Sequence, residues 1–103
     1  EAELRPQVYV AAVSEDERGP ALALASELRR AGVRPVVLDY RGKSLKAQLK
    51  EAGKSGAAFT VVLGADEVST GTAVLRDMQA GEESSLPQPE LAAQILRSAS
   101  TTS

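Results

Sequence analysis

The chain has 103 residues, 43% of them hydrophobic, which suits one domain with one core. It contains no cysteine and no histidine, so disulfides, thiolate metal sites and the commonest general base are excluded. The net charge of −2 points to no partner, but residues 41–54 carry +4 and the remainder −6. A basic segment on an acidic chain predicts a localised anion-binding face.

Sequence features also bear on the compartment. No apolar run approaches the roughly 20 residues that span a bilayer, so we expect no membrane partner. Residues 1–6 lack the basic start and apolar run of a signal peptide. Together with the missing cysteines, this predicts a cytoplasmic protein. Because the first residue is Glu1 and not Met, we expect a fragment of a longer chain.

In chain order, residues 7–13 form a nearly continuous apolar run, which predicts a strand buried on both faces. Gly19 and Pro20 open a helix, since proline suits a first helical turn. Gly32 is a predicted C-terminal cap of that helix. The apolar stripe of this helix consists of Ala21, Leu24, Ala25 and Leu28.

A second strand is predicted around residues 36–38, followed by a short loop, residues 41–43. Ser44 is a good N-cap for a helix over residues 45–54. The spacing predicts a buried face on that helix made by Leu45, Leu49 and Ala52. A second face carries lysines four residues apart, namely Lys46, Lys50 and Lys54.

A third buried strand is predicted over residues 58–64, and Asp66 and Glu67 follow it in a loop. Residues 72–78 and 83–86 read as a hairpin around a turn at 79–81. A last helix follows Pro89, with a buried stripe of Leu91, Ala92, Ile95 and Leu96. Residues 98–103 are predicted to be a frayed polar tail.

This order of elements predicts a single α/β domain over residues 1–103. Three strands joined by helices imply right-handed crossovers and a parallel core, to which the hairpin adds an antiparallel edge. We therefore expect a three-layer α/β/α fold with a five-stranded mixed, mostly parallel sheet and three helices.

Catalytic and cofactor motifs are missing. The glycines never reach the GxGxxG or GxxxxGK[ST] spacing; residues 42–44 read GKS, but Val37 stands where the first glycine is needed. Asp66 and Glu67 suit either a metal or phospho-acceptor pocket or a solvated turn. We favour the turn, because no further acid follows the first strand. We therefore predict no catalytic residue, metal or cofactor in this domain.

Three aromatic side chains are candidates for base stacking. Tyr9 and Phe59 lie within apolar strand runs, which favours core packing. Tyr40 closes the second strand beside Arg41, and its position in the core or at the surface stays open.

The basic segment is the strongest functional signal. A lysine stripe is commonly an ordinary solvated helix face. Here, however, the acids lie elsewhere in the chain. Arg41 and Lys43 extend the stripe to the helix N-terminus, where free N–H groups favour phosphate. RNA or another polyanion is therefore the predicted ligand, and DNA is not expected.

The chain resembles the C-terminal anticodon-binding domain of bacterial histidyl-tRNA synthetases. The resemblance is carried by residues 39–52, which read DYRGKSLKAQLKEA, and by residues 54–57, KSGA. Residues 28–33, 59–67, 71–72, 76–77 and 81–82 are also similar to the family, and the likeness runs from about Val8 to Leu96. It implies a five-stranded mixed sheet with three helices that docks the anticodon stem-loop of histidine tRNA.

The same resemblance implies a parent synthetase whose catalytic core lies elsewhere, uses ATP with Mg, and is homodimeric and cytoplasmic. In this domain it implies that Arg41 and Lys43 contact the anticodon loop, that Lys46 and Lys50 contact phosphates or base edges, and that Lys54 also belongs to the anticodon-binding residues. Gln48 and Glu67 are expected to meet base edges.

Two other readings stay open. The domain could be a synthetase-like module repurposed in a regulator or as a protein-interaction surface. It could also be a small catalytic α/β domain such as a receiver, which the missing acid cluster and glycine loop argue against.

Overall fold

The structure is a computed structural model that describes residues 7–100. A five-stranded sheet, with strand order β2-β1-β3-β4-β5, forms its middle layer. Strands β2, β1 and β3 are parallel, and β4 and β5 complete the sheet as an antiparallel hairpin. The strands are β1 (Val8–Ala12), β2 (Val36–Leu38), β3 (Phe59–Leu63), β4 (Thr72–Asp77) and β5 (Glu82–Pro87).

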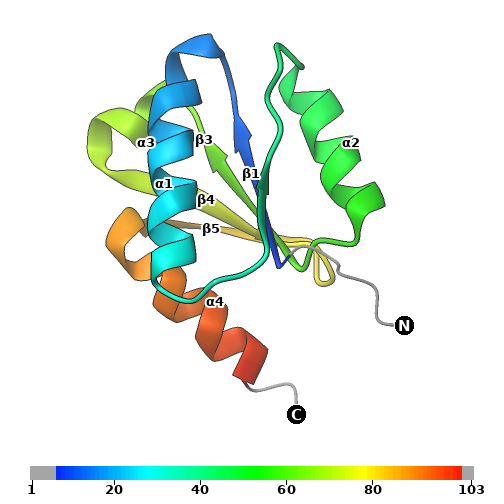
Figure 1. Cartoon of the computed structure of the whole chain (residues 1–103), viewed down its shortest axis with the longest axis vertical. Helices are drawn as coiled ribbons and strands as arrows, with labels where there is room; N and C mark the ends of the chain where they lie inside the picture. Colours follow the sequence, from blue (N-terminus) through cyan, green and yellow to red (C-terminus); the bar gives the residue numbers. More distant parts are fainter. Residues whose placement is uncertain (1–6, 101–103) are drawn as a thin grey trace.

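Helices cover both faces of the sheet (Figure 1). One face is covered by α1 and α4, and the other by α2, as the three-layer prediction requires. The helices are α1 (Arg18–Arg30), α2 (Leu45–Ser55), α3 (Ala65–Thr70) and α4 (Leu91–Ser100), with 3₁₀ turns at Glu15–Glu17 and Gln88–Glu90. None of the helices in the described part of the chain is long and apolar enough to cross a membrane.

Two predictions about helices were wrong in detail. The segment around Asp66 and Glu67 is not a loop but the short helix α3, so the described residues hold four α-helices and not three. Its six residues are too few to show a helical apolar stripe, and none of them is buried. Helix α4 continues to Ser100, so the predicted frayed tail is helical at its start; residues 101–103 lie outside the described residues.

The main core lies between the sheet and the α1–α4 layer. It is built from aliphatic side chains, and Leu28, Leu63, Leu91 and Ile95 are among its fully buried members. The prediction that Phe59 packs in the core is confirmed. Tyr40, whose position the sequence left open, is half-buried and packs against this core.

A smaller cluster lies under α2 on the other face. It contains Tyr9, Ala52 and Ala57, with Val37 and Met78 packed against it. Tyr9 is 3% exposed, which confirms its predicted core position. Helix α2 rests on this thinner layer.

Candidate nucleic-acid interface

The basic segment begins at the carboxyl edge of the parallel strands. The chain leaves β2, passes through the turn at residues 40–43 and enters α2. Because β1 lies between β2 and β3, the crossovers diverge at this edge, and open α/β sheets commonly bind ligands at such a point. Glu67 follows β3 at the same edge. The turn and Glu67 therefore both border the edge where this class of fold binds ligands.

The turn holds Arg41 in an uncommon backbone conformation. The Lys43 N–H donates to the Tyr40 carbonyl over 2.7 Å, and φ is 35° at Arg41 and 70° at Gly42. Positive φ at both central residues is typical of a type I′ turn, which favours glycine or asparagine. Among the described residues, Arg41 is the one non-glycine residue with positive φ. An arginine at this position therefore costs conformational energy.

Asp39 binds both cations of the turn. Its Oδ1 accepts from Arg41 Nε at 2.6 Å, and its Oδ2 accepts from Arg41 Nη2 at 2.8 Å and from Lys43 Nζ at 3.2 Å. The hydrogen bonds from Arg41, and then those from Lys43, lower the pKa of Asp39 below its ordinary value. The carboxylate is therefore ionised at neutral pH and neutralises part of the charge counted for residues 41–54.

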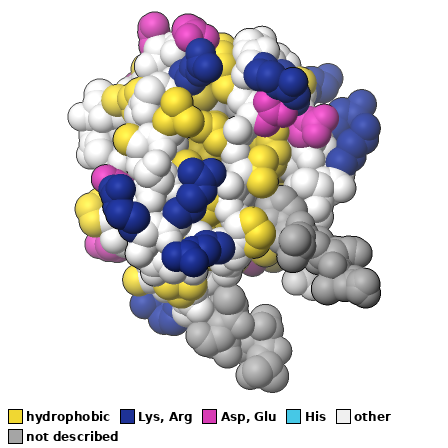
Figure 2. All heavy atoms as spheres, viewed as in Figure 1, with side chains coloured by type: hydrophobic (Ala, Val, Ile, Leu, Met, Phe, Trp, Pro, Cys, Tyr) yellow, Lys and Arg dark blue, Asp and Glu magenta, His cyan; other side chains and the backbone are white. Residues whose placement is uncertain are grey.

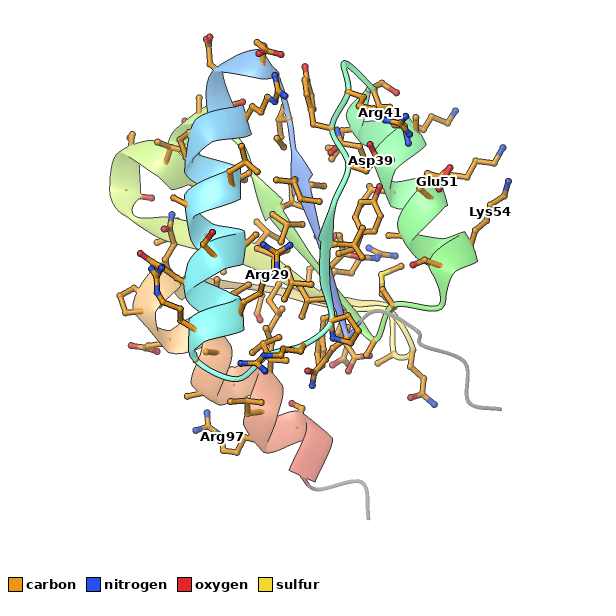
Figure 3. All side chains as sticks on the ribbon, viewed as in Figure 1. Arg29, Asp39, Arg41, Glu51, Lys54 and Arg97 are labelled. Carbon is orange, nitrogen blue, oxygen red and sulfur yellow. The ribbon has the colours of Figure 1, made fainter. Side chains whose placement is uncertain are left out.

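The lysines of α2 remain available to a ligand. Lys46, Lys50 and Lys54 are exposed, and no ion pair involves them in the part of the chain that the structure describes. Figure 3 shows Lys54 directed away from the body of the protein near the end of α2, while Asp39 and Arg41 lie near its start. In Figure 2, Lys and Arg side chains gather at the upper right, with acidic side chains between them. The predicted lysine face is thus present and accessible.

The buried face of α2 differs from the prediction. Gln48 and Ala52 are its fully buried residues, whereas Leu45 and Leu49 are only half-buried. The helix is rotated so that Gln48, and not a leucine, meets the sheet. The ends of α2 are as predicted, because Ser44 Oγ accepts from the Ala47 N–H at 3.1 Å and Gly56 caps the other end with φ of 78°.

The prediction that Gln48 presents its amide to a base edge is therefore corrected, because Gln48 is 0% exposed. Its Oε1 accepts from the Ala12 N–H at 3.0 Å, and its Nε2 donates to the Ala12 carbonyl at 2.7 Å and the Lys43 carbonyl at 3.1 Å. A side chain with both ends engaged by backbone has no free edge for a base.

Gln48 instead makes the hydrogen bonds to β1 that a longer β2 would make. The β1–β2 pairing ends at Val10 and Leu38, two residues short of Ala12. The Val8 N–H donates toward β2 and the Val13 N–H donates toward β3. Because backbone groups alternate sides along a strand, those of Ala12 face the β2 side, where β2 has already ended. The Gln48 amide satisfies them and, through Lys43, ties the basic turn to the sheet.

Glu67 has a local structural role at this edge. Its Oε1 accepts from the Gly64 N–H at 2.8 Å, in the first turn of α3. A Cβ at position 64 would lie 2.9 Å from that oxygen and 3.2 Å from Val13 Cγ2, so a larger residue there would displace the Glu67 carboxylate. The side chain is half-buried, and one of its oxygens is already engaged.

Two residues near the site were not among the predicted contacts. Asp39 lies two residues before the basic segment, residues 41–54, and was therefore left out of its charge count. Its i,i+4 spacing to Lys43 is the signal that could have indicated the ion pair. The Tyr9 hydroxyl is buried without a hydrogen-bond partner, and it is the one such side-chain atom among the described residues. No feature of the sequence predicts an unpaired hydroxyl.

The opposite end of the molecule carries a hollow of about 660 Å³. Gln7, Ala57, Phe59 and Met78 contribute to its lining, and no lysine or arginine is among the described residues that line it. It lies at the amino ends of the parallel strands, remote in the fold from the basic turn. The anion-binding features therefore belong to the carboxyl edge and α2.

Comparison with known proteins agrees with this architecture. The chain is similar to a histidine–tRNA ligase of Desulforamulus reducens, with 49% identity over 86 residues, covering 84% of this chain and 20% of that protein. It is also similar to the ligase of Geobacter sulfurreducens, with 41% identity, covering 88% and 22%. The chain thus spans about a fifth of the length of these curated relatives.

Solved structures agree as well. A histidyl-tRNA synthetase from Nostoc sp. PCC 7120 superposes with a TM-score of 0.86 at 30% identity, covering 92% of this chain and 23% of that one. The RNA-binding domain of a threonyl-tRNA synthetase from Cryptosporidium parvum shares the fold, with a TM-score of 0.83 at 21% identity over 90% of this chain and 23% of that one. The anticodon binding domain family model matches residues 7–98. Since that match covers nearly the whole chain, the protein belongs to the anticodon binding domain family.

Proposed function

We propose that this chain is the anticodon-recognition domain of a histidine–tRNA ligase and holds the anticodon stem-loop of histidine tRNA. The observation that carries the proposal is the exposed lysine face of α2, continuous with a cation-bearing turn at the carboxyl edge of the sheet. Relatives named histidine–tRNA ligase, at 39–50% identity over this domain, support the amino acid assignment.

Each cation has a part in this proposal. Lys46, Lys50 and Lys54 are exposed and form no ion pair with another described residue, so they contact the RNA backbone, which dominates affinity without reading sequence. Arg41 and Lys43 lie at the start of the helix and contact the loop. Glu67 retains one oxygen for a base amino group. Gln48 contacts no RNA and supports the turn from beneath.

The parent enzyme supplies what this domain lacks. In the proposal, a catalytic core elsewhere in the parent chain binds ATP with Mg and esterifies histidine to the tRNA end. The parent is a cytoplasmic homodimer. The domain contributes affinity and discrimination to that reaction, and its partners are the tRNA and the catalytic core.

Removal of two lysines tests the assignment. Lys46→Ala/Lys50→Ala should weaken binding of the anticodon stem-loop and make the plot of log affinity against log salt shallower by about 0.7–0.9 for each lost phosphate contact. The matched control is Arg18→Ala/Arg97→Ala, which removes two positive charges outside the basic segment. Equal affinities and slopes for the lysine variant and the unmodified chain would refute the proposed contacts.

Substitution of the anticodon bases separates decoding from general polyanion binding. If the domain reads the anticodon, each wrong base should lower affinity about 5- to 150-fold, as expected for 1–3 kcal/mol per mismatched contact. An affinity that depends on salt but not on the anticodon bases would instead indicate a repurposed module.

A further inference from the structure

Tyr9, Val37 and Asp39 share one face of the sheet. Tyr9 on β1 lies directly opposite Val37 on β2. Asp39 is two residues beyond Val37, so the alternation of strand side chains directs it to the α2 side, where Tyr9 also lies. The Tyr9 ring packs under α2, and its hydroxyl lies close enough to Asp39, Glu51 and Arg41 for their charges to shift its pKa.

The Tyr9 hydroxyl is uncompensated in this arrangement. It is buried, and no described residue offers it a hydrogen-bond partner. Burial raises the pKa of Tyr9, and the negative charges of Asp39 and Glu51 raise it further, with Arg41 opposing them. The hydroxyl therefore stays protonated at neutral pH and can donate a hydrogen bond. The negative charge of Asp39 acts on it. A buried donor without an acceptor is costly, which suggests that it has a partner in another state of the protein.

The Arg41–Asp39 pair is well formed but exposed. The side chain of Arg41 is 74% exposed and that of Asp39 is 32% exposed. An exposed ion pair contributes little to stability, and a phosphate can replace a carboxylate on the same guanidinium fork. The positive φ of Arg41 places this side chain on an uncommon and strained turn conformation.

We propose that Asp39 is a positioning residue that holds Arg41 until an RNA phosphate takes it, and that the Tyr9 hydroxyl then binds the freed carboxylate. This inference rests on the proposed function, since the phosphate belongs to the anticodon stem-loop. The exchange loses one ion pair, gains an arginine–phosphate contact, and satisfies the buried hydroxyl. Without Tyr9, release of Arg41 would leave Asp39 with Lys43 alone beside an incoming polyanion.

Tyr9→Phe tests the exchange, because it removes the hydroxyl and no charge. In the free chain the thermal midpoint should stay equal or rise, since the hydroxyl makes no bond there. Affinity for the histidine tRNA anticodon stem-loop should fall about three- to tenfold, the range for one lost hydrogen bond. The salt slope should become shallower by about 0.7–0.9, because Arg41 stays on Asp39.

Thr60→Val is the matched control. Thr60 pairs with Tyr9 across β1 and β3, is fully buried, and donates its hydroxyl to Met78 Sδ at 3.0 Å. This variant also removes a buried hydroxyl from the α2 side of the sheet, but one with a partner inside the fold. Its affinity and salt slope should equal those of the unmodified chain.

A double-mutant cycle with Asp39→Ala completes the test. Tyr9→Phe should have no further effect on RNA affinity in the Asp39→Ala background, since no acceptor remains at position 39. Unchanged affinity of Tyr9→Phe, or effects of the two substitutions that simply add, would overturn the inference. If Lys46→Ala/Lys50→Ala still weakens binding in that case, the proposed function stands and only the exchange fails. If the unmodified chain does not bind the stem-loop, both fail.

Discussion

The two faces of the sheet are built differently. The α1–α4 face is covered by aliphatic side chains that are fully buried, among them Leu28, Leu91 and Ile95. The α2 face has a small cluster of Tyr9, Ala52 and Ala57, together with the buried amide of Gln48. Apolar packing supplies non-directional stability, whereas buried polar groups specify geometry at a cost. The comparison indicates that one face stabilises the domain and the other positions its cations.

Truncation of a core side chain on the α1–α4 face should produce the largest loss of stability. Leu28 is 2% exposed, so Leu28→Ala should lower the free energy of unfolding by about 2–5 kcal/mol through lost burial and the cavity left behind. Chemical denaturation measures this loss. Leu22→Ala on the same helix is the matched control, because Leu22 is 50% exposed, and it should cost far less. Equal losses for the two variants would contradict the burial that the structure shows.

Loss of the buried amide should damage the positioning face. Gln48→Leu leaves both Ala12 peptide groups without their partner and should lower the free energy of unfolding by about 2–4 kcal/mol. Because the Lys43 carbonyl is also released, the same variant should weaken stem-loop binding at temperatures where it remains folded. Leu28→Ala should not weaken binding in its folded fraction, and this contrast separates the two faces.

Gln94→Leu controls for the loss of a glutamine. Gln94 on α4 is half-buried and accepts from Arg97 Nη2 near the surface, so its replacement should change stability by less than about 0.5 kcal/mol. If Gln48→Leu were as mild as Gln94→Leu, the amide would not be holding the turn to β1.

The smallest expected effect is a fall in the free energy of unfolding at alkaline pH, caused by Tyr9 on the α2 face. The pKa of Tyr9 is raised above 10.0 by burial, and then by Asp39 and Glu51, against the opposing charge of Arg41. Above pH 10 the unfolded chain therefore loses a proton that the folded chain keeps, so stability falls as the pH rises. Denaturation midpoints measured on both sides of pH 10 should show a smaller decline in Tyr9→Phe. The same decline in both proteins would show that Tyr9 is not its source.

Much of the fold could be predicted because its signals are local. The apolar runs of β1 and β3 predict buried strands, and the helix caps at Ser44 and Gly32 agree with the observed helix ends. The spacing of Lys46, Lys50 and Lys54 places them on one exposed face. Helix α3 was missed because a six-residue element with no buried residue leaves no periodic pattern.

By itself, then, the sequence determined the order of the strands and of the three longer helices, the parallel core and the lysine face, since each depends on residues close together in the chain. Only the tertiary structure decided that Gln48 is buried and bonded to backbone. Its partner Ala12 is 36 residues away in the chain and is available because β2 ends early. The same holds for the unpaired Tyr9 hydroxyl, which is buried where β1, β2 and α2 meet. Helical periodicity shows which residues share one face of a helix. Which of those faces turns toward the sheet is decided by the side chains and backbone groups that pack against the helix.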